Sequence, residues 1–534
     1  IRGGRSRRCH HVLSHRPTLQ RPLIMSVGRV SAGAGMVLVV LACTPSCWRM
    51  LSYIDMAYPA LVVSICLSVA AFFVTYGAIQ FSRNAFAAQG LNGVDLLKRD
   101  LWPPHTKPPI VPEALGLPCA AVYLLALVVF IPFRYFGSSM YGLPIDVVGR
   151  GASAPGVHQD LASFLSALLS IYSGTLLGFV DDVLDIRWRH KLPIPLLSSI
   201  PMLVVYMAGG GSTSIVVPAW PPLLRQTLGC SSVHLGWLYY VFMMLLATFC
   251  TNCINILAGI NGVEVGQALV IAVSVCINDV LYLNIPGVIR AAWESSSDTP
   301  SPSHILDGYH GSTDLVVRHL FSLHLLVPFI GTSLALFLWN RYPARVFVGD
   351  TYCYFAGMVL VSCGILGHYS KTLLLFFFPQ IFNFVLSCPQ LFGLVPCPRH
   401  RVPFVDTDSQ TLYPSCVRLT ERALPTRLML ALLEQLRCVQ RIYDESGQVV
   451  GTTNLTLLNA LLVLRGVRVA PASKADLLAS RSKTDPVLRP APVRHTLCVS
   501  EHSLWYYTMG VQALGSAMAF MIRYWLSSII FPAT

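Results

Sequence analysis

Long apolar runs alternate with polar segments over most of the chain. Ten of these runs approach the roughly 20 residues that an α-helix needs to cross the hydrocarbon core of a bilayer. They lie near 57–80, 115–136, 161–180, 192–208, 235–254, 263–283, 319–339, 350–366, 372–395 and 504–531. This pattern predicts an all-α polytopic membrane protein with about ten transmembrane helices. The 192–208 run is the shortest and contains three prolines, so we expect it to be kinked or packed against its neighbours.

One long polar stretch separates the last two apolar runs. It contains β-like segments and a helical segment near 455–465, and it predicts a small α/β cytosolic subdomain. The expected organisation has four parts. These are a basic, disordered extension at 1–56, a transmembrane core at 57–396, the cytosolic loop subdomain at 397–503, and a last transmembrane helix at 504–534.

The loops between the runs fall into two alternating sets. One set lies at 82–114, 181–191, 251–262, 340–349 and 396–503. Its short members carry more Lys and Arg than the other set, which places it in the cytoplasm by the positive-inside rule. The basic N-terminal tail contradicts that placement. Either the tail is removed, or residues 36–54 insert as an extra segment, or the topology is inverted, and the helix count does not decide.

Composition agrees with a membrane environment. The chain is 54% hydrophobic and 12% charged, against about 25% charged residues in soluble domains. A net charge of +13 would suggest nucleic acid in a soluble protein. Here basic residues flank apolar helices, where they meet anionic lipid or substrate phosphates. We therefore expect membrane lipid as a partner and no nucleic acid.

Carboxylates gather where one apolar run ends. Asp181 and Asp182 are adjacent there, and Asp185 lies one helical turn beyond Asp181. Three carboxylates at a membrane edge would repel one another unless a metal ion or a cation stood between them. A solvated helix end is the alternative, although acidic groups directly after an apolar span are costly unless they are used.

Two further clusters supply oxygen ligands and an aromatic ring. Asn252 and Asn255 share one helical face, before a turn containing Gly259, Asn261 and Gly262. An asparagine oxygen can bind a hard cation, but the same residues also form ordinary interhelical turns. In the second cluster Asp350 lies where an apolar run resumes, and an unpaired carboxylate there indicates a functional site. Phe347, three residues earlier, is suited either to stacking on a flat base or to the membrane interface.

A basic cluster follows the ninth run. Arg399, His400 and Arg401 lie between prolines, and guanidinium groups bind phosphate in a bidentate manner. Alone, this segment reads as an ordinary positive flank. However, all these clusters lie in the same set of loops. Carboxylates, an amide, arginines and a lysine are the groups that magnesium-dependent phosphoryl transfer requires.

The clusters also carry a family resemblance. The segments LGFVDDVLDIRWRHKLPIP, FCTNCINILAGINGVEVGQ, RVFVGDTYCYFAGM, GILGHYSKTLLLFFFPQIFNF and PCPRHRVP closely resemble eukaryotic polyprenyl-phosphate sugar-1-phosphate transferases, which are glycosyltransferase family 4-like. The resemblance covers about 57–404 and the last helix. It implies a ten-helix fold in the endoplasmic reticulum membrane, with a cytosolic active site that uses Mg²⁺. The implied reaction transfers N-acetylglucosamine 1-phosphate from UDP-N-acetylglucosamine to dolichyl phosphate and releases UMP, the first step of dolichol-linked oligosaccharide synthesis for protein N-glycosylation.

The resemblance also implies residue roles. Asn255 and Asp350 would bind magnesium, and the catalytic residues would be Asp181, Asp182 and Lys191, with Lys191 holding the dolichyl phosphate. Asn252 belongs to the segment expected to line the lipid-phosphate groove. The positions matching nucleotide-sugar contacts are Val94, Asp95, Leu96, Glu113, Asn261 and Phe347. The positions matching contacts to the diphosphate and N-acetylglucosamine are Arg399, His400 and Arg401.

The sequence departs from the family pattern in places. Asp185 stands where the family has Asn, and an extra segment at 102–104 makes the alignment of Lys98 and Glu113 less certain. A homodimer is compatible with the resemblance, but the sequence does not decide the oligomeric state. Within the enzyme class, another prenyl phosphate or another UDP-sugar is the alternative substrate. A transporter or channel is the rival class, but it should place charges near helix midpoints rather than at one end.

Overall fold

The computed structural model describes most of the chain. The described residues are 58–95, 97, 109–140, 157–184, 186, 188–191, 193–219, 225–227, 229–283, 313–419, 424–479, 486–493 and 498–531. The predicted N-terminal extension, Leu96, Lys98, Asp185 and the 102–104 segment lie outside these residues.

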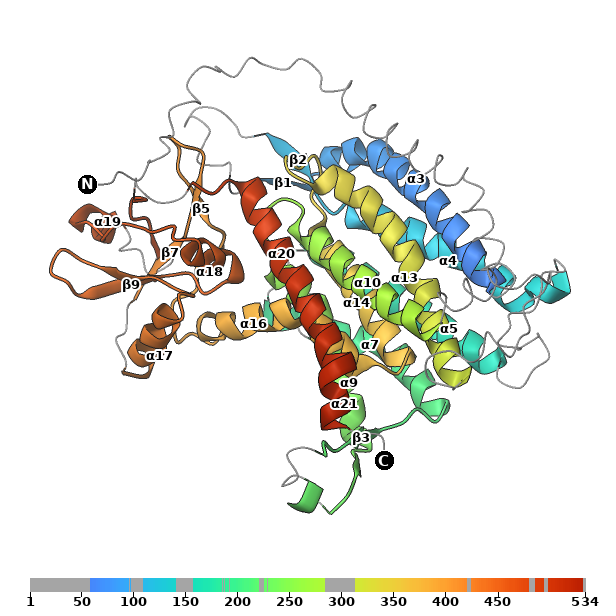
Figure 1. Cartoon of the computed structure of the whole chain (residues 1–534). Helices are drawn as coiled ribbons and strands as arrows, with labels where there is room; N and C mark the ends of the chain where they lie inside the picture. The colour runs from blue at the N-terminus through green and yellow to red at the C-terminus, as the bar shows by residue number, and fades with distance from the viewer. Residues whose placement is uncertain are drawn as a thin grey trace, which may run out of the picture.

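Eight helices among the described residues are long and apolar enough to cross a membrane. They are α3 (Pro59–Ala88), α4 (Gly116–Met140), α5 (Val157–Leu184), α9 (Trp237–Ile256), α10 (Val263–Tyr282), α13 (Thr313–Asn340), α14 (Gly349–Leu366), and α20 (Glu501–Phe520) continued by η2 (Met521–Leu526) and α21 (Ser527–Ile530). A shorter apolar helix, α7 (Pro193–Ala208), occupies the run with three prolines. These helices lie side by side as a bundle (Figure 1), which confirms the predicted polytopic α-helical class.

The ninth apolar run is not one straight span. It forms α15 (Ser370–Phe376) and α16 (Phe378–Leu391), which meet at an angle of 72°. Pro379 lies in the first turn of α16, where proline is tolerated at a helix start, and it cannot donate the hydrogen bond that would continue α15. In Figure 1 α16 extends sideways from the bundle towards α17. A periodicity argument sees only an uninterrupted apolar run and misses this bend.

Helix α14 forms the centre of the bundle. Every residue from Thr351 to Leu366 is buried, and α14 packs against α5, α9, α13 and α4. Gly357 allows the closest approach, because a Cβ there would lie 2.6 Å from the backbone nitrogen of Thr251 and 2.8 Å from the carbonyl carbon of Cys250. Small residues let helix backbones come together in this way inside membranes.

Three buried glutamines connect the bundle's helices. Gln380 donates to the side-chain oxygens of Gln267 (2.8 Å) and Gln512 (2.6 Å), so α16, α10 and α20 are linked. Gln267 in turn donates to the carbonyl oxygens of Ile254 and Leu257 at the end of α9. Those carbonyls have no partner within their own helix, so the side chain of Gln267 satisfies them.

A small α/β subdomain lies between α16 and α20. Its four-stranded antiparallel sheet has the order β10 (Val487–Leu488), β7 (Cys416–Arg418), β9 (Val449–Thr453) and β8 (Arg441–Tyr443). Its helices are α17 (Leu424–Gln435), α18 (Leu457–Leu464) and α19 (Lys474–Ala479). Figure 1 shows it to one side of the bundle, with α17 and α19 on opposite sides of the sheet.

Short antiparallel strand pairs and one short helix complete the loops. The pairs are β1 (Asn92–Val94) with β2 (Ile110–Pro112), β3 (Ser214–Val216) with β4 (Ser232–His234), and β5 (Phe404–Val405) with β6 (Leu412–Tyr413). The short helix is α6 (Trp188–Lys191). The β1–β2 pair is joined to the segment before α14, because the backbone nitrogen of Phe347 donates to the carbonyl of Pro112 at 2.7 Å.

The central contact can be tested by substitution. Gly357→Ala should lower the thermal stability of the detergent-solubilised protein, because the added methyl group forces α14 away from α9, an overpacking cost of about 1–3 kcal/mol. Gly77→Ala is the matched control, since nothing lies within 4 Å of a Cβ at that helical position. Equal melting temperatures for the two variants would contradict close packing of α14 on α9.

Candidate active site

A lysine and three polar side chains from different helices meet at one end of α14. Lys191 Nζ lies 2.6 Å from Asp350 Oδ2 and 2.8 Å from Asp181 Oδ2. Asn255 Nδ2 donates to Asp350 Oδ1 at 2.6 Å. Lys191, Asn255 and Asp350 are each more than 60 positions apart in the sequence. The fold nevertheless joins them and Asp181, all predicted site residues, in one connected cluster. This polar cluster is defined as Asp181, Lys191, Asn255 and Asp350.

Asp182 makes a different set of contacts from its neighbour Asp181. Its carboxylate accepts hydrogen bonds from the backbone nitrogens of Asp350 (2.6 Å) and Thr351 (3.0 Å) and from Thr351 Oγ1 (2.5 Å). These donors belong to the first turn of α14, where backbone N–H groups have no partner within the helix and the helix dipole favours a negative charge. Asp182 therefore caps α14 from another helix and sets the position of Asp350.

Gly349 makes this cap possible. Its φ is +72°, in the left-handed region, and a Cβ there would clash with the Asp182 carboxylate. Glycine adopts this conformation at no steric cost and leaves room for the carboxylate to reach the helix end.

One wall of the site comes from the β1–β2 pair and the segment before α14. Gly93, Glu113 and Phe347 are close neighbours, since a Cβ on Gly93 would lie 3.0 Å from Glu113 Oε2 and 3.2 Å from the Phe347 ring. Asn261 closes this side: its side chain donates to Asp95 Oδ2 at 3.4 Å, and its backbone nitrogen donates to Glu501 Oε1 at 2.8 Å.

The opposite wall is the Arg399–Arg401 segment, held by the subdomain. Asn459 Nδ2 donates to the carbonyl of Arg401 at 2.9 Å, and Ser415 Oγ donates to the same carbonyl at 3.4 Å. Burial removes the Arg401 guanidinium from water, and this loss of hydration lowers its pKa. Its Nη1 is buried without a hydrogen-bond partner among the described residues, so a guanidinium edge is available to an anionic ligand.

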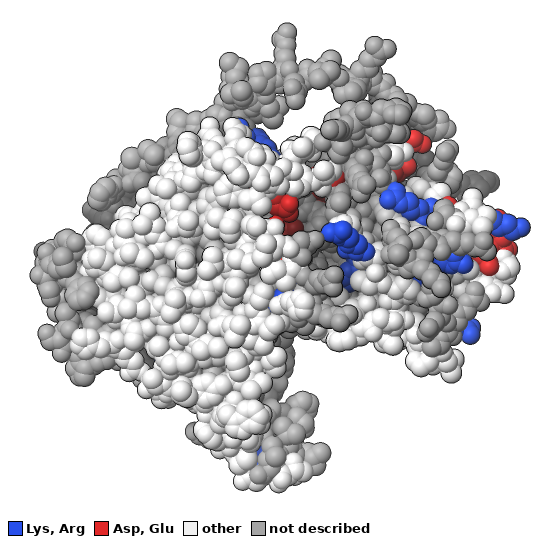
Figure 2. Space-filling view, turned by 180° about the vertical axis from the view of Figure 1, so that it is seen from behind, with Lys and Arg blue, Asp and Glu red and all other residues white. Residues whose placement is uncertain are grey.

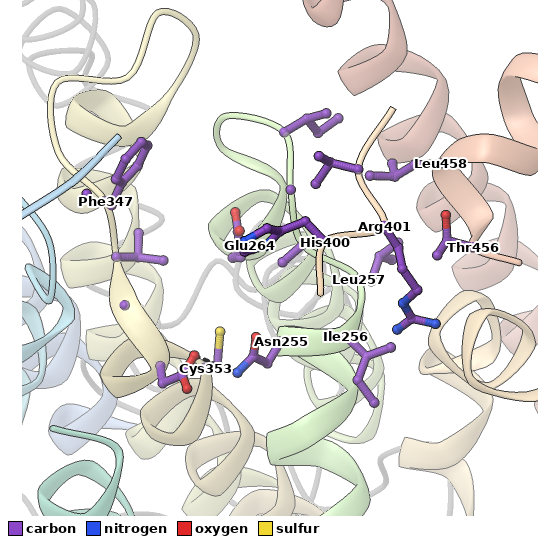
Figure 3. A pocket seen from close by; sticks show the side chains of 18 of the residues that line it. Asn255, Ile256, Leu257, Glu264, Phe347, Cys353, His400, Arg401, Thr456 and Leu458 are labelled. Carbon is purple, nitrogen blue, oxygen red and sulfur yellow. Dashed lines mark hydrogen bonds between the residues drawn. The ribbon is translucent and has the colours of Figure 1, made fainter. Parts of the chain in front are cut away.

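These walls enclose a cavity of about 860 Å³. Figure 3 shows Phe347 and Arg401 on opposite sides of it, with His400 between them and Asn255 below. Twelve of the predicted site residues line the cavity: Val94, Asp95, Glu113, Lys191, Asn252, Asn255, Asn261, Phe347, Asp350, Arg399, His400 and Arg401. Asp181 and Asp182 do not line it but contact Lys191 and the start of α14, and Leu96 lies outside the described residues.

Sequence reasoning missed several residues that build the site. Thr351 and Asn459 are positioning residues whose partners are distant in sequence, so no local pattern reveals them. Glu264 also lines the cavity. It belongs to the segment with Asn255 and Asn261, and an acidic residue just after the glycine turn was the available signal.

The acidic groups shift the ionisation of their neighbours. The pKa of Glu113 is raised, first because the carboxyl is largely removed from water and second because Asp350 is negative. For Lys191, burial alone would lower the pKa, but Asp350 and Asp181 outweigh it and the pKa is raised. Lys191 is therefore protonated at neutral pH and available to neutralise phosphate charge.

The donor set suits magnesium. No group of three His, Cys, Asp or Glu side chains with metal-binding geometry occurs within the described ranges. Magnesium does not require one, because it keeps several waters and uses one or two carboxylates together with substrate phosphates. The Asp350 carboxylate beside the Asn255 amide provides such a partial set of hard oxygen ligands at the cavity wall.

The raised pKa of Glu113 has a measurable consequence. A carboxyl whose pKa is higher in the folded state destabilises the fold once the pH exceeds its pKa, and the penalty vanishes below the pKa of the unfolded state. Glu113→Gln should therefore raise the melting temperature by a few degrees at pH 8 and by less at pH 5, as read from thermal unfolding in detergent. Glu445→Gln, at an exposed carboxylate, should change neither value. A gain for Glu113→Gln that does not depend on pH would contradict this explanation.

Comparison with known proteins identifies close relatives of the chain. Residues 164–368 match the family described as Glycosyl transferase family 4. A UDP-N-acetylglucosamine–dolichyl-phosphate N-acetylglucosaminephosphotransferase from Saccharomyces cerevisiae is 40% identical over 418 residues, covering 76% of this chain and 85% of the relative. The proteins of the same name from Schizosaccharomyces pombe (38% identity; 88% of this chain, 94% of the relative) and Dictyostelium discoideum (42%; 68% and 81%) are similarly related. The chain therefore belongs to the family of UDP-N-acetylglucosamine–dolichyl-phosphate N-acetylglucosaminephosphotransferases.

Proposed function

We propose that this protein transfers N-acetylglucosamine 1-phosphate from UDP-N-acetylglucosamine to dolichyl phosphate, giving N-acetylglucosaminyl-diphosphodolichol and UMP. The observation that carries the proposal is the connected cluster of Asp181, Lys191, Asn255 and Asp350. Its last three members line a cavity between an aromatic wall and an arginine wall, and Asp181 pairs with Lys191 from behind. Phosphoryl transfer depends on positioning and on charge stabilisation, and this cavity offers groups for both.

The two walls suit the two halves of the nucleotide sugar. Phe347 is placed to stack on the uracil, with Asp95 and Asn261 nearby for polar contacts. On the other side, Arg399, His400 and Arg401 are placed to bind the diphosphate and the N-acetylglucosamine. The diphosphate then lies over the polar cluster, where Lys191 faces it.

The lipid phosphate would approach along α9 and α16. Asn252 and Asn255 of α9 line the cavity, as do Asn383 and Gln390 of α16. In the transfer, an oxygen of dolichyl phosphate forms a bond to the β-phosphorus, and the bond from that phosphorus to the bridging oxygen breaks. UMP leaves with the electron pair, so no oxidant or reductant is involved.

Asp350 and Asn255 would hold a magnesium ion, which spreads the negative charge of the transferring phosphoryl group when it is bound. Lys191 orients the lipid phosphate by ion pairing and hydrogen bonding. Asp181 holds the Lys191 ammonium through their ion pair at 2.8 Å. Asp182 is a positioning residue, because its hydrogen bonds hold the first turn of α14 and therefore the position of Asp350.

We also propose a location in the endoplasmic reticulum membrane, with the cavity facing the cytosol. The loops that build the cavity are those in which the sequence concentrates Lys and Arg, as expected for cytoplasmic loops. The same clustering at one end of the bundle disfavours a transporter, which needs ionisable groups along a path through the membrane.

A dual-label transfer assay tests the reaction. Membranes containing the protein receive dolichyl phosphate, magnesium and UDP-N-acetylglucosamine labelled in both the sugar and the β-phosphate. Both labels should enter lipid and UMP should be released, with the rate falling at least roughly a hundredfold in Asp350→Ala. Transfer of the sugar without its phosphate would indicate an ordinary glycosyltransferase and contradict the proposal, as would an absence of transfer by folded protein that binds UDP-N-acetylglucosamine.

The division of labour between Asp181 and Asp182 can be tested with paired variants. Asp182→Asn keeps an oxygen that accepts hydrogen bonds from α14, so it should retain most of the activity. Asp182→Ala loses the cap and should fall by roughly a hundredfold, as a misplaced reacting group does. The measurements are kcat and melting temperature for each variant. If the Asn variant were as inactive as the Ala variant while remaining stably folded, Asp182 would have a chemical role instead.

A further inference from the structure

Helix α17 carries a row of exposed leucines. Leu424, Leu428, Leu432 and Leu436 follow one another at intervals of four residues, and 57–66% of each side chain's surface is exposed. Residues four apart lie on one side of a helix, so the row forms a continuous apolar stripe along α17 and its C-terminal end. Scattered exposed leucines need no explanation, but an aligned set of four marks an interaction surface.

The other face of α17 is already used. Leu430 is 1% exposed and packs in an apolar cluster with Val439 of the subdomain and Leu386 of α16, while Met429 and Leu433 pack against the same cluster. The leucine stripe therefore cannot turn inward, and α17 is held in place beside a helix of the bundle.

Exposed apolar side chains also occur on the neighbouring part of α16. At the end of α16, Phe392 and Leu394 are 72% and 62% exposed, and Val385 on α16 itself is 61% exposed. Figure 1 shows α17 next to this end of α16, on the side of the sheet turned away from β5 and α19. In Figure 2 the charged side chains lie at the centre and over the right-hand side of the view, and the large surface of the bundle on the left is almost free of them.

The charges of α17 suit a membrane surface. Arg427 and Arg437 are exposed beside the stripe, whereas the one acidic side chain, Glu434, is neutralised by Arg441 at 2.5 Å. An apolar face flanked by arginines is the pattern of helices that lie in the interface of a bilayer containing anionic lipid.

We propose that α17 lies in the membrane interface, with its leucine stripe at the level of the upper acyl chains and Arg427 and Arg437 at the lipid phosphates. The partner is the lipid surface itself, and the helix holds the subdomain against the same bilayer that the bundle spans. This proposal does not depend on the proposed function.

Contact between α17 and the membrane has a structural consequence for the cavity. The subdomain holds the Arg401 carbonyl through Asn459 and Ser415, so its position determines where the arginine wall stands. Membrane contact at α17 thus orients a wall more than 20 residues away in sequence.

The test places a fluorescent amino acid in the full-length protein in nanodiscs containing phosphatidylcholine and phosphatidylserine. The probe replaces Leu428 in one preparation and Leu478 in another. Leu478 is the matched control because it is a similarly exposed leucine, at 58%, and lies outside the stripe, on α19 at the far side of the sheet. Lipids with a nitroxide on the upper acyl chain should quench the probe at 428 several-fold more than the probe at 478.

Equal, weak quenching at both positions would overturn the proposal, and it would do so even if the enzyme were fully active. A second pair of variants tests whether membrane contact at α17 positions the subdomain. Leu428→Glu with Leu432→Glu should raise KM for UDP-N-acetylglucosamine several-fold in nanodiscs, while Leu478→Glu should leave it unchanged. If the double variant kept both its KM and its hydrogen-exchange protection over 424–437, the stripe would not be resting on lipid, and a protein partner would be the alternative occupant.

Discussion

The contact between the Asp182 carboxylate and the first turn of α14 is the constraint on which the site depends. Helix α14 has the largest buried share among the described membrane-spanning helices, and within it only Gly349 and Asp350, at its N-terminal end, are partly exposed. A carboxylate from α5 satisfies that end and fixes the direction in which Asp350 projects. Asp350 then holds Lys191 and Asn255, so one helix cap determines the geometry of the whole polar cluster.

A second constraint comes from the membrane. Polar groups within an apolar bundle must find partners in the protein, because lipid offers none. The side-chain amide nitrogens of Gln267, Gln380 and Gln512 all find acceptors within the protein, and these bonds connect three helices to the end of α9. The same bonds therefore hold Asn255, which lies in the last turn of α9, at a defined height in the bundle.

The sequence alone predicted much of this arrangement, and the reason is physical. Apolar length identifies spans because the bilayer sets their length, and the motif clusters carried enough specific residues to identify the family. The bend between α15 and α16 escaped prediction, because Pro379 lies in a run whose hydropathy is unbroken. Likewise, Asp181 and Asp182 could be named but not distinguished, since they differ in their contacts with Lys191 and Thr351, which only the folded chain brings near.

The bend at Phe377 has a consequence for any acceptor that carries a very long hydrocarbon tail. Helix α16 brings Asn383 and Gln390 to the cavity while it exposes Phe378, Phe382 and Val385 on its surface. Each methylene removed from hydrocarbon into water costs about 0.8 kcal/mol, so withdrawing a polyisoprenoid from the bilayer is prohibitive. A helix that leans out of the bundle lets the phosphate head reach the polar cluster sideways. The tail then never has to leave the lipid, and the enzyme acts on a substrate that diffuses in two dimensions.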